Sequence, residues 1–181
     1  SFGASGAKTW SRSGTWGRSE MAQGYPDPEV YNTTTKLLKY NADNYPHAVA
    51  LREKDYGIWR ELSWAGFNGR VRDIALALRA RGLGEGDVVG LIGDNNIDWV
   101  SVEMAVHAIG AMSMGIYRDA LDDEVGYLGE YAAVTAVYAE DQEQIDKFLN
   151  LGDRLPGLRH IIFSDPRGLR AVEDDLSLIH I

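Results

Sequence analysis

Glu103 and His107 are the two side chains whose types and spacing come closest to catalytic or metal-binding chemistry. Four residues apart, they would lie one turn apart on a helix, where they could share a proton or a metal ion. A protein metal site needs at least three ligands, and the neighbouring sequence offers no third one. We therefore interpret the two as a structural polar pair at the edge of a buried helix.

An acidic cluster, Asp122 to Glu124, is a second candidate for cation binding. Its three carboxylates are the hard oxygen ligands that Mg²⁺ and Ca²⁺ prefer. They also fall where a helix is expected to begin, and carboxylates in a first helical turn complement the helix dipole without any metal. The sequence favours this second explanation because it requires no further ligand.

The remaining histidines and serines show no partner for acid–base or nucleophilic chemistry. The histidines are His47 in a loop, His160 at the start of a strand and His180 near the carboxyl end. The serines Ser101, Ser113 and Ser164 lack the glycine-flanked turn that exposes a serine nucleophile. The sequence therefore predicts no catalytic residue, no cofactor-binding residue and no metal ligand in this chain.

Two glycine-containing segments resemble a phosphate-binding turn only superficially. Gly82 to Gly86 follows a helix and precedes a strand, which inverts the order in which glycines let a pyrophosphate approach a helix N-terminus. Gly90 to Gly93 does lie between a strand and a helix, but the third glycine of the dinucleotide motif is absent. We interpret the first segment as a helix end with a tight turn, and the second as a strand-to-helix connection.

Strands and helices are expected to alternate along most of the chain. Apolar alternation around Asp55-Tyr56-Gly57 predicts a β-hairpin, after which Ser63 caps a helix that ends at Gly82. The expected strands are 87–92, 111–117, 134–139 and 159–163. Two helices are expected at 97–109, where Asn96 is the cap, and at 122–131. A third helix is expected to begin at a capping box formed by Asp141 and Gln144 and to bury Ile145, Phe148 and Leu149. Short connections imply right-handed crossovers. The predicted fold class is therefore α/β, a Rossmann-like parallel sheet with flanking helices and a leading β-hairpin.

Charge and composition argue against a nucleic-acid partner. The chain has 181 residues, enough for one domain, and a net charge of −9, so nucleic-acid binding would require a local basic patch. The densest basic run, Arg70 to Arg81, alternates with apolar residues at helical spacing and is typical of a solvated helix face. Trp59, Trp64 and Trp99 are assigned to core or hairpin packing rather than to base stacking.

The chain ends and the lack of cysteine bear on location and boundaries. Without cysteine there are no disulfides or thiolate metal sites, which fits a reducing compartment. No run approaches the roughly 20 apolar residues that span a bilayer, so we expect a cytoplasmic protein and leave peripheral membrane contact open. Residues 1–20, rich in Ser and Gly, are expected to be a disordered or non-native leader, with Met21 as the start. Residues 21–175 form the expected structural unit, and 176–181 a doubtful tail, interpreted as foreign sequence.

Several short sequence motifs occur along the chain in an order that resembles one protein family. Leu51 to Trp59 reads Leu-Arg-Glu-Lys-Asp-Tyr-Gly-Ile-Trp, and it is followed by Gly-Asp-Val-Val-Gly-Leu-Ile-Gly-Asp-Asn at 86–95 and Ile-Tyr at 116–117. The segments 139–147, 153–156, 160–162 and 165–169 continue the series. Together they are similar to the amino-terminal part of bacterial long-chain fatty-acid–CoA ligases, of the AMP-forming, adenylate-forming superfamily. The resemblance covers about residues 33–170, and it implies that 21–175 are the amino-terminal part of an AMP-binding domain.

The resemblance also implies a reaction for the parent enzyme. In this family ATP and Mg²⁺ activate a fatty acid to an acyl-adenylate, and the acyl group then passes to CoA. The family's phosphate loop ending in Lys, its adenine motif, its ribose-binding Asp and its carboxyl-terminal Lys do not occur in this chain. The resemblance therefore implies a piece that is inactive alone and binds no cofactor. The loops 93–96 and 117–121 would lie nearest the cleft, but they match no functional motif of the family.

Two alternatives stay open at this stage. The chain could belong to another adenylate-forming enzyme, such as a peptide-synthetase adenylation domain or a short-chain acyl ligase. It could also be a freestanding Rossmann-like binding or interaction module, which would require the native gene to stop near residue 175.

The helix 97–109 is apolar nearly all round, and the strand 112–117 beside it reads Met-Ser-Met-Gly-Ile-Tyr, so both are expected inside the sheet assembly. Later segments of a parent enzyme would complete the sheet. We therefore expect the isolated chain to expose an unpaired strand edge and to self-associate.

Overall fold

The structure is a computed structural model that describes residues 25–167 and 177–181, so the expected leader at 1–20 lies outside the described residues. The helices are α2 (Thr34–Asn44), α3 (Trp64–Ala80), α4 (Ile97–Ala108), α5 (Asp122–Ala132), α6 (Gln142–Leu151) and the short 3₁₀ helix η1 (Gly152–Arg154). The strands are β1 (Val49–Asp55), β2 (Ile58–Ser63), β3 (Val88–Ile92), β4 (Met112–Ile116), β5 (Ala136–Ala139), β6 (His160–Phe163) and β7 (Ser177–His180).

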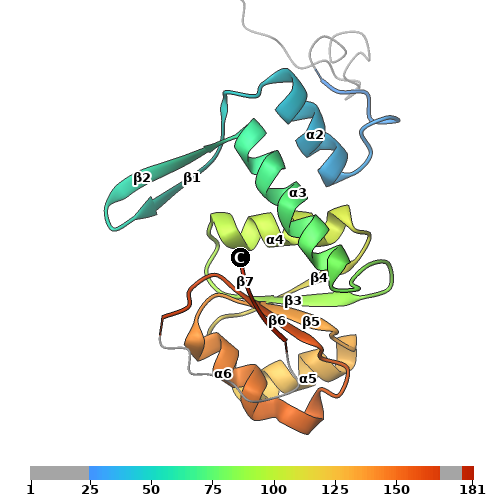
Figure 1. The fold of residues 1–181 in the computed structure, drawn as a ribbon, viewed down its shortest axis with the longest axis vertical. Helices are drawn as coiled ribbons and strands as arrows, with labels where there is room; N and C mark the ends of the chain where they lie inside the picture. Colours follow the sequence, from blue (N-terminus) through green and yellow to red (C-terminus); the bar gives the residue numbers. More distant parts are fainter. Residues whose placement is uncertain (1–24, 168–176) are drawn as a thin grey trace, which may run out of the picture.

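Five of the strands form one parallel sheet in the order β4-β3-β5-β6-β7. Helices α2, α3 and α4 lie on one side of this sheet and α5 and α6 on the other (Figure 1). The predicted α/β fold, with a parallel sheet and flanking helices, is confirmed. Strands β1 and β2 form a separate antiparallel hairpin that projects to one side of the molecule (Figure 1).

The central strands divide their side chains between two apolar cores. Val89 and Leu91 of β3 pack in the core beneath α3 and α4, while Ile92 belongs to the core beneath α5 and α6. In β5, Tyr138 and Val137 are divided between the two cores in the same way. This period of two explains why these strands are almost continuously apolar: both faces of a parallel sheet are covered, so every position except Val88 at the start of β3 is buried.

Helix caps follow the residues that the sequence singles out. Ser63 accepts a hydrogen bond from the N–H of Gly66 at 3.2 Å, and Asn96 accepts one from Trp99 at 2.8 Å. Asp141 accepts the N–H of Gln144 at 3.1 Å. The reciprocal half of the predicted capping box is wrong, because both polar atoms of the buried Gln144 side chain lack a partner among the described residues.

Three further features differ from the expectations. Helix α2 and strand β7 are absent from the prediction, and β7 places part of the doubtful tail beside β6. The expectation that the strand near 112–117 lies inside the sheet is wrong. Strand β4 is an edge strand of the described sheet, and Met112 is 57% exposed.

Candidate functional site at the carboxyl edge of the sheet

The loops that follow β3, β4, β5 and β6 meet at one edge of the parallel sheet. Open parallel sheets bind ligands in the crevice outside the carboxyl ends of their strands, so this edge is the place to look for a site. The loops are 93–96, 117–121, 140–141 and 164–167. The first two are the loops that the sequence places nearest to a cleft.

Glu140, directly after β5, connects three of these loops. Its carboxylate accepts the N–H of Asp94 at 2.7 Å and the side-chain amide of Asn96 at 2.9 Å. Its carbonyl oxygen accepts the N–H of Asp165 at 3.0 Å and the hydroxyl of Ser164 at 3.4 Å. A single carboxylate residue thus holds the loop after β3 and the loop after β6 against the end of β5.

Gly93 makes the close approach to Glu140 possible. Its φ is +151°, in the region that favours glycine, and a Cβ there would stand 2.7 Å from the Cβ of Glu140. Both facts exclude a larger residue at this position. The glycine is therefore required by the packing of two loops, in agreement with its interpretation as part of a strand-to-helix connection.

Arg118 ties the loop after β4 to the same edge. Its guanidinium donates to Asp94 at 2.6 Å and lies 3.8 Å from a carboxylate oxygen of Asp141. The hydrogen bond to Asp94 is the main cause that raises the pKa of Arg118 above its ordinary value. The ammonium of Lys147 in α6 donates to the carbonyls of Arg118 and Ala120, at 2.6 and 3.0 Å. The Arg118 side chain remains 39% exposed, and Arg167 in the loop after β6 is 75% exposed, so this edge presents two cations to solvent.

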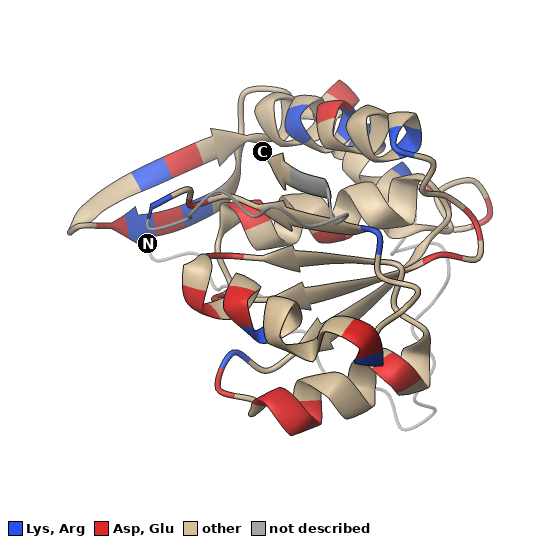
Figure 2. Cartoon of the chain, turned by 60° about the horizontal axis from the view of Figure 1, so that its bottom comes forward, with Lys and Arg blue, Asp and Glu red and all other residues tan. Residues whose placement is uncertain are grey.

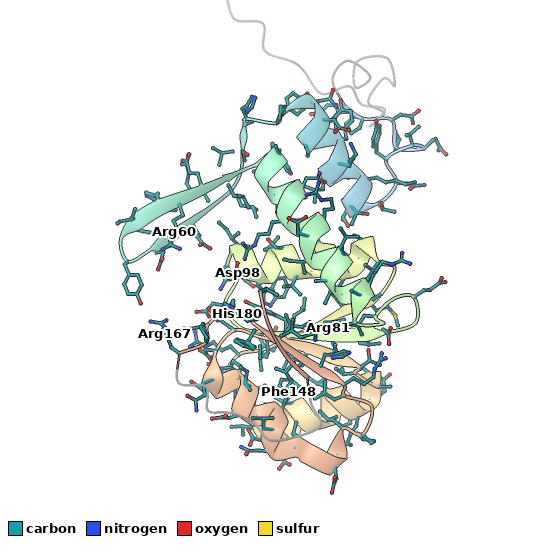
Figure 3. All side chains as sticks on the ribbon, viewed as in Figure 1. Arg60, Arg81, Asp98, Phe148, Arg167 and His180 are labelled. Carbon is teal, nitrogen blue, oxygen red and sulfur yellow. The ribbon has the colours of Figure 1, made fainter. Side chains whose placement is uncertain are left out.

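The end of β6 adds a second polar cluster. The hydroxyls of Tyr138 and Ser164 are 3.0 Å apart, and burial raises the pKa of Tyr138 above its ordinary value. His180 of β7 donates from Nε2 to the carbonyl of Ser164 at 3.1 Å. Arg167, labelled with His180 in Figure 3, donates to the Asp165 carboxylate at 2.9 Å, and this bond lowers the pKa of Asp165 to about 2.

A hollow of ≈ 710 Å³ lies beside this edge, between the loop after β4 and helix α5. Its lining residues are Tyr117, Asp119, Ala120, Asp123, Glu124, Tyr127 and Leu128. Among the described residues, the wall is formed by tyrosines, carboxylates and two apolar side chains, and it includes no cationic side chain that could bind phosphate.

The residues that the sequence singled out for chemistry are not brought together. His107 of α4 bonds Ser113 at 2.9 Å rather than Glu103, so the proposed polar pair is not formed. The acidic cluster occupies the first turn of α5. There Glu124 accepts the N–H of Leu121 at 3.0 Å and Asp123 pairs with Arg154 at 3.0 Å. Within residues 25–167 and 177–181, no three His, Asp or Glu side chains cluster closely enough to hold a metal ion.

The other singled-out positions have structural contacts. Ser101 is buried and donates to the carbonyl of Ile97 at 2.6 Å, and His160 donates from Nε2 to the carbonyl of Arg81 at 3.2 Å. Gly82 and Gly86 have φ of +80° and +90° in the turn between α3 and β3, as a tight turn requires. Arg70 pairs with Asp98 of α4, so the basic run contacts protein carboxylate.

Sequence reasoning missed Glu140 and Arg118, the two residues that organise the edge. The signal that could have found them is positional. Both stand within two residues of the carboxyl end of an expected parallel strand, where side chains from different strands meet. The edge carries charged side chains and hydroxyls that are held in place by hydrogen bonds. Among the described residues it has no serine–histidine pair and no glycine-rich loop that could bind phosphate. Such an arrangement can position a ligand or another segment of the protein.

The fold and its edge define a Rossmann-like α/β unit of the kind found in nucleotide-dependent enzymes. The profile of the family described as AMP-binding enzyme matches residues 38–176, and the chain belongs to that family.

Relatives agree with this assignment. The chain is 26% identical over 130 residues to the long-chain-fatty-acid–CoA ligase ACSBG2 of Xenopus laevis, a match that covers 72% of this chain and 18% of the relative. It is 28% identical over 120 residues to the uncharacterized protein Rv1549 of Mycobacterium tuberculosis, covering 66% of this chain and 65% of that protein. The chain thus spans about a fifth of the length of the long-chain-fatty-acid–CoA ligases that it matches, 18% and 22% in two cases.

Solved structures show the same fold. The anthranilate CoA ligase AuaEII superposes with a TM-score of 0.67 at 22% identity, covering 74% of this chain and 25% of that enzyme. At this identity the similarity concerns the fold alone. The described sheet and its helices therefore correspond in fold to about a quarter of that enzyme.

Proposed function

We propose that this chain is the amino-terminal part of an ATP-dependent acyl–CoA ligase that acts on long-chain fatty acids. The observation that supports this is the family match over residues 38–176, together with relatives named long-chain-fatty-acid–CoA ligases. In the proposed reaction the fatty-acid carboxylate attacks the α-phosphate of ATP and releases pyrophosphate. The CoA thiol then takes the acyl group and releases AMP.

In this proposal the chain supplies scaffold rather than catalysis. Fatty acid, ATP and CoA are substrates and partners of the whole enzyme, and Mg²⁺ neutralises phosphate charge there. We assign no catalytic, cofactor-binding or metal-binding residue to the chain itself. Transition-state stabilisation at phosphates needs donors aimed at the developing charge, and the exposed cations of the edge, Arg118 and Arg167, are already paired with Asp94 and Asp165.

ATP–pyrophosphate exchange tests the proposed division of labour. The purified 181-residue chain should show no exchange with palmitate above a heat-inactivated sample. A full-length long-chain-fatty-acid–CoA ligase, assayed in parallel, is the positive control. Exchange by the chain alone would contradict the proposal that it is inactive alone.

Sequencing the native gene past codon 175 tests the parent enzyme separately. An open reading frame that continues into a Ser/Thr/Gly-rich loop ending in Lys supports the ligase proposal. A native stop codon at that point would overturn it, whatever the exchange assay shows.

A freestanding binding or interaction module is the second candidate function. The observation in its favour is Rv1549, whose match covers 65% of its own length, so a protein of related sequence exists at a comparable size. A native stop codon near 175 together with a stable monomer would support this candidate.

We further propose a cytoplasmic location, because ATP and CoA are supplied there, and self-association of the isolated chain. Strand β4 leaves one edge of the described sheet unpaired, and Met112 is 57% exposed beside it. Size-exclusion chromatography with light scattering at micromolar concentration should show species heavier than 20.0 kDa. A stable monomer with a sharp cooperative melt contradicts this expectation.

A further inference from the structure

The β1–β2 hairpin has two unlike faces. Residues directly opposite in an antiparallel pair share a face, and the register places Lys54 opposite Trp59 and Arg52 opposite Glu61. These four residues are called the outer face. Alternate positions, among them Leu51, Glu53, Asp55, Ile58, Arg60 and Leu62, form the inner face.

The inner-face residues nearest the body of the protein, Leu51, Glu53 and Leu62, contact it, and the acidic side chains of this face are paired. The carboxylate of Glu53 accepts the N–H of Ile97 at the start of α4, at 2.8 Å. Asp55 pairs with Arg60, which Figure 3 labels on the hairpin. Leu51 and Leu62 pack against the core beneath α3 and α4. The acidic side chains of the inner face are therefore engaged within the fold.

The outer face presents an aromatic ring between two cations. Trp59 is 60% exposed, with the guanidinium of Arg52 at 6.0 Å and the ammonium of Lys54 at 5.9 Å from its ring centroid. Arg52 also pairs with Glu61 at 2.6 Å, which leaves this face with a net charge of +1 on a chain of net charge −9. Of the two settings expected for Trp59, core or hairpin packing, the structure shows the second: the ring packs on the hairpin against Arg52 and Lys54 of β1 and stays outside both apolar cores.

Two further apolar side chains are exposed at the tip of the hairpin, although the register places Ile58 on the inner face. Tyr56 and Ile58 are 86% and 69% exposed on either side of Gly57. Figure 2 shows that Asp and Glu residues are most numerous in α5 and α6, which lie on the opposite side of the sheet from α3. Three large apolar side chains and two cations therefore gather on one protruding element, away from the densest carboxylates.

We propose that the outer face and tip of this hairpin dock the chain on an anionic lipid bilayer. Trp and Tyr rings favour the boundary between headgroups and acyl chains, where one part of the ring is apolar and another is wet. Arg and Lys beside them contact lipid phosphates while their apolar stems remain near the boundary. Within the described residues no helix has the length and apolar character of a membrane span, so the contact is peripheral. The proposal is independent of the ligase assignment.

Vesicle flotation on a sucrose gradient tests the proposal, because floating vesicles carry bound protein upward while self-associated protein sinks. The full chain is mixed with vesicles of phosphatidylcholine and phosphatidylglycerol at a ratio of about 7:3, at low salt where surface charge is least screened. The chain should float with these vesicles, less with pure phosphatidylcholine, and Trp59→Ala should weaken binding about tenfold, as expected when a large apolar anchor is lost. Trp59→Phe should retain most of it.

Matched variants separate a hairpin contact from general effects. Lys54→Glu should weaken binding about fivefold or more, because it reverses one surface charge at the contact. Arg72→Glu makes the same change in net charge on α3, where Arg72 is exposed, and should change binding less than about twofold. Tyr131→Ala removes an 81% exposed ring from α5 and serves as the aromatic control. Absence of flotation, or equal losses in the hairpin variants and the controls, would overturn the proposal.

Discussion

The carboxyl edge of the sheet and the outer face of the β1–β2 hairpin both lie outside the apolar cores, yet their charged side chains are exposed to different degrees and make different contacts. At the edge, Glu140 and Arg118 form hydrogen bonds to neighbouring loops, so each of these charged groups has a hydrogen-bond partner within the same chain. On the hairpin, Arg52 and Lys54 flank a ring that faces solvent.

This difference separates stability from recognition. Bonds among half-buried groups hold loops in one arrangement, because a donor left without its acceptor costs free energy. Exposed charges and rings contribute little to folding, since water satisfies them equally well. Substitutions at the edge should therefore change the free energy of unfolding, and substitutions on the outer face of the hairpin should change binding.

The largest expected effect is at Gly93. Gly93→Ala places a Cβ 2.7 Å from the Cβ of Glu140 on a backbone with φ of +151°, and we expect a loss of about 2–4 kcal/mol in the free energy of unfolding. Urea titration followed by circular dichroism measures it. Gly69→Ala in α3 is the control: nothing lies within 4 Å of its Cβ, so the change should stabilise by up to about 1 kcal/mol. Equal stabilities of the two variants would refute the role of Gly93.

Two carboxylates allow a direct test of the contrast between edge and hairpin. Glu140→Ala leaves the N–H of Asp94 and the amide of Asn96 without their acceptor, and it should cost about 1–3 kcal/mol. Glu61→Ala breaks the pair with Arg52, whose two side chains are 47% and 55% exposed, and should cost about 0–1 kcal/mol. Urea midpoints of both variants, measured together, give the comparison. If Glu61→Ala proves the more costly, the contrast fails.

The smallest expected effect concerns pH. Burial is the main cause that lowers the pKa of His160, and its buried Nδ1 has no described partner for a second proton. Below about pH 6.5 the unfolded chain then binds a proton more readily than the folded chain, so this contribution to stability is present above that pH and lost as the pH falls through the folded pKa.

Thermal melts between about pH 5 and 8 measure this dependence. His160→Gln keeps a donor toward the carbonyl of Arg81 and should flatten the slope on the acidic side. His47→Gln, in the exposed loop before β1, is the matched control and should keep the slope. A wild-type slope in the His160 variant would assign the effect to other groups.

Local signals in the sequence predicted most of the elements. Ser63 and Asn96 cap the helices that they were expected to cap, and Gly82 adopts the left-handed conformation expected after α3. These features depend on residues within a few positions, so local chemistry decides them. Helix α2 was missed, although Thr33 caps it by accepting the N–H of Lys36 at 3.2 Å. Its buried residues are Leu38 and Ala42, too few for a clear apolar period.

The candidate site could be predicted only in part. The loops 93–96 and 117–121 follow β3 and β4 at the carboxyl edge, as alternating strands and helices imply for a parallel sheet, whereas their place nearest to a cleft stays a prediction. The role of Glu140 depends on the order β3-β5-β6, which sets its carboxylate against a loop 46 residues earlier in the chain. Strand order is a long-range property, and no pattern in the neighbouring sequence specifies it.

The sequence by itself determined the α/β class, the helix caps, the hairpin turn and the family resemblance. The first three depend on short-range periodicity or local hydrogen bonding, and the resemblance depends on short motifs. Only the tertiary structure decided that β4 is an edge strand, that Glu140 and Arg118 organise the carboxyl edge, and that Trp59 faces solvent between two cations. These outcomes depend on which residues distant in sequence become neighbours. The physical reason is that burial and pairing are set by the packing of whole elements, which a single stretch of residues does not encode.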